Sequence, residues 1–294
     1  MAKAGNRYSK LIEYIFLENY RSEAQEVNFR REDLVSAAKE LDIALPKNLG
    51  DVIYSFRYRT ALPESIRELA PDGLEWVIRS VGQAKYKFSL TAMPHIVPNS
   101  LLAEIKIPDA TPGIITRYAL NDEQALLAKI RYNRLIDIFT GVTCYSLQNH
   151  LRTTVPDMGQ VETDEVYIGV NKHGAQYVFP VQAKGRSDQL GIIQVEQDFA
   201  LCAAKFPQLV CRPVAAQFME DNLIALFIFE TGEKGVVINE EKHYRLVSPE
   251  EMTDEDLDKY RKETVETIPR KRLRSIEGIG EDQEVSGQEH DKYL

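Results

Sequence analysis

Cysteine and long apolar runs are both scarce in this sequence, and each scarcity argues against a class of protein. Only 3 cysteines occur in 294 residues, and none forms a Cys-x-x-Cys pair, so neither a disulfide framework nor a cysteine zinc site is indicated. No stretch approaches the roughly 18 apolar residues that a transmembrane helix requires, and the first residues lack the apolar segment of a secretory signal. We therefore expect a cytoplasmic protein with no membrane partner.

An excess of positive charge is also missing. The formal net charge is -9 at pH 7, whereas domains that bind nucleic acid are commonly basic. Most of this negative charge lies in residues 248–294, and a nuclease itself needs acidic residues around its metal ion. The overall charge therefore does not exclude a DNA substrate. Hydrophobic residues make up 44% of the chain, which is enough to form the core of a globular protein.

The first 92 residues predict three helices followed by a β-hairpin. Apolar residues such as Leu11 and Ile15 repeat at helical spacing, and similar stripes begin near positions 31 and 49. Two runs of alternating polar and apolar residues then flank Gly82, which is the signature of a hairpin.

This order of elements resembles a winged helix-turn-helix domain, which implies that the third helix enters the major groove of DNA. The exposed face of that helix would carry Arg57, Tyr58 and Arg59 to the bases, while Lys85 and Lys87 on the hairpin would contact phosphates. Winged helices also bind other proteins, so a structural or partner-binding role for this domain remains open.

The middle of the chain predicts a connector, two helices and a group of strands. Residues 93–120 are rich in proline and predict an extended connector; a helix over residues 122–139, with Asn121 and Gln124 placed as a capping box, and a shorter helix over 145–152 follow. Strands are expected at 161–170, 176–184, 209–219 and 223–230, with a helix beginning near residue 192 between the second and third.

Three domains follow from this pattern. They are a DNA-binding domain over residues 1–92, an α/β domain over residues 93–247, and an acidic tail over residues 248–294. Within the tail, residues 250–262 predict a solvated helix, and residues 278–294 have the composition of a disordered segment.

The two strands around the turn at residues 171–174 carry the polar residues that suggest chemistry. Strand alternation places Gln182 and Lys184 on one face of the second strand, and the hairpin can bring Asp164 alongside them. Carboxylate and amide oxygens are hard ligands that suit Mg²⁺, and a lysine can stabilise negative charge that develops on a phosphate. The arrangement therefore favours metal-dependent hydrolysis of phosphodiester bonds. The alternative is a cross-strand salt bridge between Asp164 and Lys184.

Asp164 followed by Gln182-Ala183-Lys184 resembles the motif of the PD-(D/E)xK nucleases, in the Gln-x-Lys variant of the Mrr-like branch. The resemblance covers about residues 122–230 and implies a restriction-endonuclease-like core, a mixed central sheet flanked by helices. It also implies that Asp164, Gln182 and Lys184 are catalytic, that Asp164 and Gln182 bind Mg²⁺ or Mn²⁺, and that Gln182→Glu is tolerated. Thr163 replaces the proline of the motif. Gln182 replaces its usual acid, and the expected helix over residues 145–152 supplies no acid in compensation.

Five further residues are candidates for this site. Glu162 and Glu165 adjoin Asp164 and are candidate metal ligands, although Glu162 also fits a solvated strand end. Gln148 and His150 are candidates either for contact with DNA phosphate or for packing, and Arg186 is a candidate for contact with the DNA backbone.

The sequence thus predicts a magnesium-dependent endodeoxyribonuclease of the type II restriction kind, acting on double-stranded DNA in restriction or genome defence. One such site cuts one strand, so a homodimer is expected, and a cognate DNA methyltransferase is a further expected partner. Two alternatives remain open: a non-catalytic DNA-binding regulator with a decayed nuclease fold, and a nuclease that acts on RNA or in repair.

Overall fold

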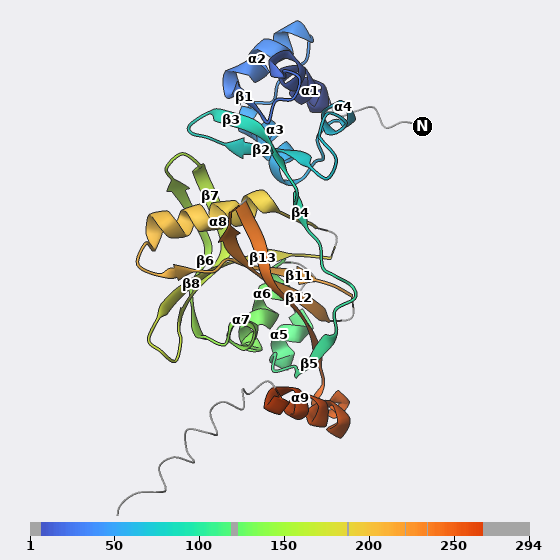
Figure 1. The fold of residues 1–294 in the computed structure, drawn as a ribbon, viewed down its shortest axis with the longest axis vertical. Helices are drawn as coiled ribbons and strands as arrows, with labels where there is room; N and C mark the ends of the chain where they lie inside the picture. The colour runs from blue at the N-terminus through green and yellow to red at the C-terminus, as the bar shows by residue number, and fades with distance from the viewer. Residues whose placement is uncertain (1–6, 119–122, 187, 221, 234, 267–294) are drawn as a thin grey trace, which may run out of the picture. The chain divides into compact units, whose positions relative to one another are not determined.

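The computed structural model describes residues 7–118, 123–186, 188–220, 222–233 and 235–266 (Figure 1). The chain separates into two units, Met1–Leu246 and Val247–Leu294. None of the described helices is long and apolar enough to cross a membrane.

The N-terminal part of the first unit joins helices to a small antiparallel sheet. The helices are α1 (Arg7–Asn19), α2 (Arg31–Glu40), α3 (Leu49–Tyr58) and the short α4 (Glu64–Arg67). The strands, in sheet order, are β1 (Glu26–Arg30), β3 (Lys85–Thr91) and β2 (Glu75–Ser80). The three expected helices and the hairpin are confirmed, whereas α4 and β1 were not expected. Because β1 pairs with β3, the second strand of the hairpin is the centre of this sheet.

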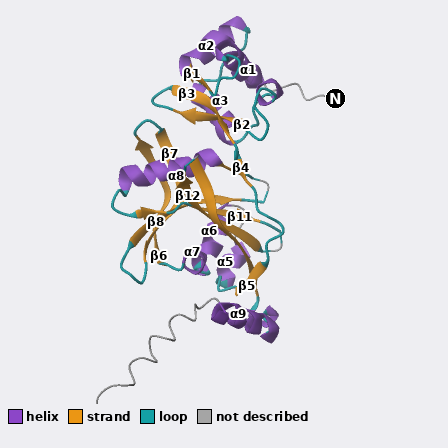
Figure 2. Cartoon of the chain, in the orientation of Figure 1, coloured by secondary structure: helices purple, strands orange, loops and turns teal. Residues whose placement is uncertain are grey.

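One large mixed sheet organises the rest of the first unit (Figure 2). Its main path runs in the order β5 (Glu104–Pro108), β13 (Gly235–Val247), β12 (Leu223–Gly232), β11 (Val214–Phe218), β8 (Gln176–Lys184), β7 (Gly159–Val170) and β6 (Thr143–Val155). The short β10 (Val210–Cys211) also pairs with β8. β8 is parallel to β11 and antiparallel to β7, so the sheet is mixed, as expected.

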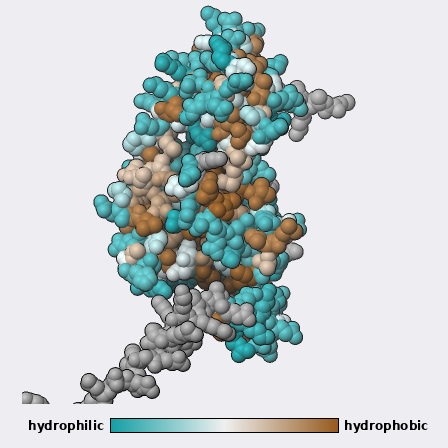
Figure 3. All heavy atoms as spheres, viewed as in Figure 1, coloured by the Kyte–Doolittle hydropathy of each residue, from teal (hydrophilic) through white to brown (hydrophobic). Residues whose placement is uncertain are grey.

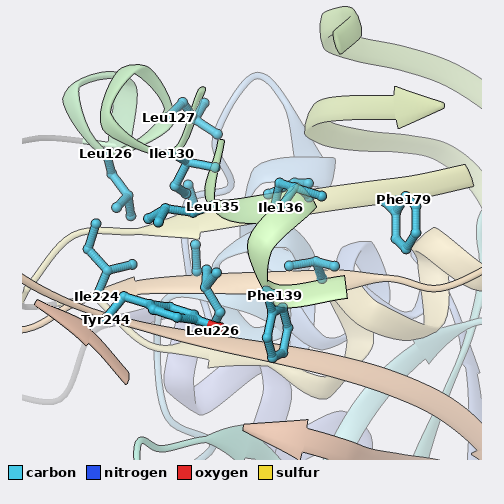
Figure 4. Close-up of a cluster of buried hydrophobic side chains, with 14 of the residues drawn as sticks. Leu126, Leu127, Ile130, Leu135, Ile136, Phe139, Phe179, Ile224, Leu226 and Tyr244 are labelled. Carbon is cyan, nitrogen blue, oxygen red and sulfur yellow. The ribbon is translucent and has the colours of Figure 1, made fainter. Parts of the chain in front are cut away.

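Helices cover both faces of this sheet, because β8 and its neighbours alternate their apolar side chains between the two faces. α6 (Glu123–Tyr132) and α7 (Leu135–Thr140) bury Leu126, Ile130 and Phe139 against one face (Figure 4). α8 (Ile192–Lys205) buries Leu201 and Cys202 against Val178 on the other. The chain is therefore a mixed α/β protein with a large mixed sheet flanked by helices.

The expected helix over residues 145–152 is wrong, because this segment belongs to β6. β6 pairs with β7 along almost its whole length, and that backbone ladder overrides the short helical pattern. β6 is an edge strand with mostly exposed side chains, so its sequence lacks the apolar alternation that marks a half-buried strand. The pairing register shifts between Ser146 and Gln148, and His150 takes a positive φ of 49°.

The other differences lie at connections. The helix expected over residues 122–139 is two helices, because Arg134 adopts a left-handed conformation between them. Asn121 and Asp122 lie outside the described residues. The expected connector contains β4 (His95–Ile96), β5 and α5 (Gly113–Tyr118), and β4 pairs with β9 (Leu190–Gly191). β13 was not expected.

The second unit contains a 3-10 turn (Pro249–Glu251) and α9 (Asp254–Glu266), close to the helix expected over residues 250–262. Figure 3 shows mostly hydrophilic residues over α9, as expected for a solvated helix. The segment expected to be disordered, residues 278–294, lies outside the described residues.

Candidate functional site

Asp164 and Lys184 lie close together where β7 and β8 pair. The Oδ2 atom of Asp164 accepts a hydrogen bond from the backbone N–H of Ala183, at 2.8 Å. Burial raises the pKa of Asp164 and the nearby charge of Glu123 raises it further, while the Ala183 hydrogen bond and the charge of Lys184 oppose the shift. Asp164 is therefore a desolvated carboxylate beside a cation and a second acid.

That second acid is Glu123, in the first turn of α6. The Nζ atom of Lys184 donates to Oε1 of Glu123 at 2.8 Å, and the Lys184 side chain is only 15% exposed. Lys184 thus pairs with a residue 61 positions away in sequence. The alternative considered from the sequence was a salt bridge across the hairpin between Lys184 and Asp164. Glu123 was not among the predicted site residues, because the helix acid was expected in residues 145–152, which form part of β6. The sequence does carry an acid in the first turn of the earlier expected helix over residues 122–139, and that acid is Glu123.

Gln182 is present at the site, but its amide is hydrogen-bonded to α8 and to the backbone of β7. Its Nε2 atom donates to the backbone oxygen of Glu162 at 3.1 Å and to the carboxyl oxygens of Asp198 at 3.1 and 3.2 Å. Its Oε1 atom accepts from Nε2 of Gln194 at 3.3 Å. The side chain is 2% exposed, and the oxygen expected to bind a metal is already engaged.

Asp198 is an acid that was not among the predicted site residues. It lies on α8 and is 1% exposed. Burial raises the pKa of Asp198 well above its usual range, although the hydrogen bond from Gln182 opposes this shift. Its position in an otherwise apolar helical stripe was the signal in the sequence.

The structure separates the two glutamates that flank Asp164. Glu165 is fully buried on the opposite face of β7, where Nη2 of Arg131 donates to Oε1 at 2.8 Å and Ser146 donates to the same oxygen. This removes Glu165 from the set of metal ligands, because successive strand residues face opposite sides of a sheet. Glu162 lies on the same strand and pairs with Arg152 at 2.9 Å, with both side chains substantially exposed.

A cleft of about 1230 Å³ contains Asp164, Glu123 and Lys184. It is also lined by basic and polar side chains that can contact an anionic polymer: Arg57, Arg59, Arg67, Gln124, His150, Arg152 and Arg186. His150 makes a 3.0 Å hydrogen bond with Gln124. Gln148 is exposed on β6 and is not among the described residues that line this cleft.

The residues expected to bind DNA in the N-terminal part have mixed surroundings. Tyr58 is half-buried and its hydroxyl donates to Oε1 of Gln197 at 3.0 Å, so its polar group is engaged within the protein. Lys87 pairs with Glu26 across the small sheet. Arg59 and Lys85 are exposed. Of the five expected residues, the cleft takes in Arg57, Tyr58 and Arg59, all at the end of α3.

The acidic groups in the cleft fit a divalent cation in part. Within the part of the chain that the structure describes, no group of three or more His, Cys, Asp or Glu side chains is arranged to hold a metal ion. The cleft does present the carboxylates of Asp164 and Glu123, and the raised pKa of Asp164 shows that negative charge there is poorly solvated. A cation would relieve that cost, and carboxylate oxygens are the ligands that Mg²⁺ prefers.

Comparison with known proteins identifies no relative: no family model, curated protein or solved structure matches the chain.

Proposed function

We propose that this chain is a metal-dependent endonuclease that cleaves double-stranded DNA, with a core of the restriction-endonuclease kind. The observation that carries the proposal is the convergence of Asp164, Lys184 and Glu123 in one cleft, from two paired strands and a helix end. The motif resemblance requires an acid and a lysine on neighbouring strands. It also often includes an acid on the helix before the first strand, and Glu123 fits that place.

The side chains have separable roles in the proposed chemistry. Asp164 and Glu123 would hold Mg²⁺ or Mn²⁺, which when bound polarises the phosphate and lowers the pKa of a water molecule. Lys184, kept in place by Glu123 and largely shielded from water, would stabilise the negative charge that develops on the phosphate oxygens. The Ala183 N–H fixes one oxygen of Asp164, which leaves the other for a cation.

The proposed substrate is duplex DNA because basic side chains line the same cleft as the acids. Arg57 lies in α3, the helix expected to enter the major groove in a winged helix-turn-helix domain, and Arg59 directly follows that helix. Arg152 pairs with Glu162, two residues before Asp164, and Arg186 lies two residues after Lys184. Phosphate contacts of this kind position a nuclease on DNA. Cutting both strands would require a homodimer or two binding events. A role in restriction in the cytoplasm, with a cognate methyltransferase, belongs to the same proposal.

A second candidate function is DNA binding without cleavage. It is favoured by the buried amide of Gln182, whose oxygen accepts from Gln194 and whose nitrogen donates to Glu162 and Asp198 rather than leaving the group free for a metal. This candidate predicts that the cleft binds DNA equally well with and without divalent cations.

Incubation of the full-length chain with supercoiled plasmid tests the proposal. The native protein should nick or linearise the plasmid with Mg²⁺ or Mn²⁺ and do neither with a chelator, and Lys184→Ala should lack activity. Gel shifts in a chelator would show whether both proteins bind DNA. Binding by both without cleavage by either, across several plasmids and both metals, would favour the non-catalytic candidate.

A further inference from the structure

A small buried polar cluster lies on the α8 side of the site. Asp198 and Gln194 of α8 contact the side chain of Gln182, and Gln182 in turn contacts the backbone oxygen of Glu162 on β7. The cluster therefore ties α8 to the two strands that carry Asp164 and Lys184. A carboxyl group that is 1% exposed is costly to bury, so its hydrogen bonds matter more than those of a surface acid.

The hydrogen bonds around Gln182 specify an amide. A glutamine side chain has two N–H groups, and here Nε2 faces two acceptors, the Glu162 backbone oxygen and the Asp198 carboxyl. Its oxygen faces a donor, Nε2 of Gln194. An ionised glutamate at the same position has no N–H group and would place an oxygen against both acceptors. The pocket thus opposes the acid that the nuclease motif usually carries at this position.

We propose that Asp198 is a positioning residue that orients Gln182 and makes position 182 select an amide over a carboxylate. Through Gln182, Asp198 holds the backbone of Glu162 against β8, two residues before Asp164. Its effect on cleavage rests on the proposed nuclease function, whereas its effect on residue choice at position 182 does not. The neutral Gln182 and the buried Asp198 on α8 are therefore complementary as hydrogen-bond donor and acceptor.

A melting comparison tests the residue choice without any need for cleavage. Gln182→Glu should lower the Tm of the full chain by about 10 °C when Asp198 is present, because two carboxyl groups would share one buried site and each would make the ionised form of the other more costly. In an Asp198→Asn background the same change should lower the Tm by less than about half as much, since the asparagine N–H can donate to the new carboxylate. The Glu162 oxygen is common to both backgrounds, so the difference isolates Asp198. Equal losses in both backgrounds would overturn the proposal.

Cleavage kinetics test the positioning role. Asp198→Ala should lower kcat about tenfold and change KM by less than about twofold, because the loss lies in the geometry of the site rather than in DNA binding. Asp198→Asn should restore most of the rate, since its Oδ1 still accepts from Gln182. Leu201→Ala on the same helix is the control, because it removes buried apolar contacts without touching Gln182.

The assays are run well below the Tm of every variant, so that all are folded. A fall in kcat for Leu201→Ala as large as that for Asp198→Ala would reduce Asp198 to a merely structural role and refute the positioning claim. A native protein that cleaves no DNA would refute the nuclease proposal instead, and the melting comparison would still decide whether Asp198 selects the amide.

Discussion

Removal of Arg131 should destabilise the protein far more than removal of Arg152, although both arginines pair with glutamates of β7. Arg131 binds Glu165, whose side chain is fully buried, with Nε and Nη2 at 3.1 and 2.8 Å from the same carboxyl oxygen. Breaking a buried pair by removing one partner typically costs about 3–5 kcal/mol, because it leaves an uncompensated charge. The Arg131 side chain is 39% exposed and Ser146 still donates to Glu165, so solvent and this remaining bond reduce the loss. We expect about 2 kcal/mol for Arg131→Ala, or a fall in Tm of about 4–8 °C.

The matched control is Arg152→Ala. Arg152 and Glu162 are 65% and 43% exposed, and exposed pairs contribute about 0–1 kcal/mol, so its Tm should fall by no more than about 4 °C. Differential scanning calorimetry of both variants in the same low-salt buffer measures the contrast. Similar Tm values for the two variants would mean that Glu165 relaxes to water or finds another donor, and the reasoning from burial would fail.

Three further predictions concern the cleft. Asp164→Asn should raise the Tm in a chelator by a few degrees. Burial raises the pKa of Asp164, so its contribution to stability is present at low pH and is lost as the pH rises through that pKa. At pH 7 the neutral amide removes the cost of burying the ionised carboxylate. The same variant should lose the rise in Tm that Mg²⁺ gives the native protein, and an unchanged rise would assign the metal elsewhere. Lys184→Ala should abolish cleavage while gel-shift affinity for DNA stays within about threefold, and cleavage near the native rate would remove Lys184 from the chemistry. Glu123→Gln should raise the Mg²⁺ concentration needed for half-maximal cleavage by about tenfold, whereas Glu165→Gln should leave that concentration unchanged, and an equal response from both would contradict their placement on different faces.

The strands that carry the motif were predictable from sequence because their pattern is local. Residues 161–170 and 176–184 are apolar runs on either side of a short turn, and the structure places strands at Gly159–Val170 and Gln176–Lys184. The edge strand β6 was not predictable in this way. Its side chains are mostly exposed, so the evidence for it is its hydrogen-bonded ladder with β7, which is a long-range contact.

The missed members of the site have the same physical origin. Glu123 and Lys184 are 61 residues apart in sequence, so no local spacing predicts that they pair. Asp198 was visible as an acid within an amphipathic helix, but its burial depends on how α8 packs on β7 and β8. Strand alternation places Glu165 and Asp164 on opposite faces of β7. Treating both as metal candidates ignored that geometry.

The placement of Asp198 also bears on whether the protein is a working nuclease or a non-catalytic DNA-binding protein with a decayed nuclease fold. A scaffold without chemistry gains nothing from a buried acid, because apolar residues of similar volume commonly stabilise a core as well or better. Here the motif position holds a neutral amide, yet a carboxyl group lies directly behind it, and the Gln182 Nε2 atom has acceptors on both sides. The carboxyl group that position 182 lacks is thus present on α8, behind Gln182, where its hydrogen bond orients the strand that carries Lys184. Replacing Asp198 with leucine separates the two cases. A site without activity should melt at the same or a higher temperature with DNA binding unchanged, whereas a working site should lose about tenfold or more in the kcat of metal-dependent cleavage whatever happens to its Tm.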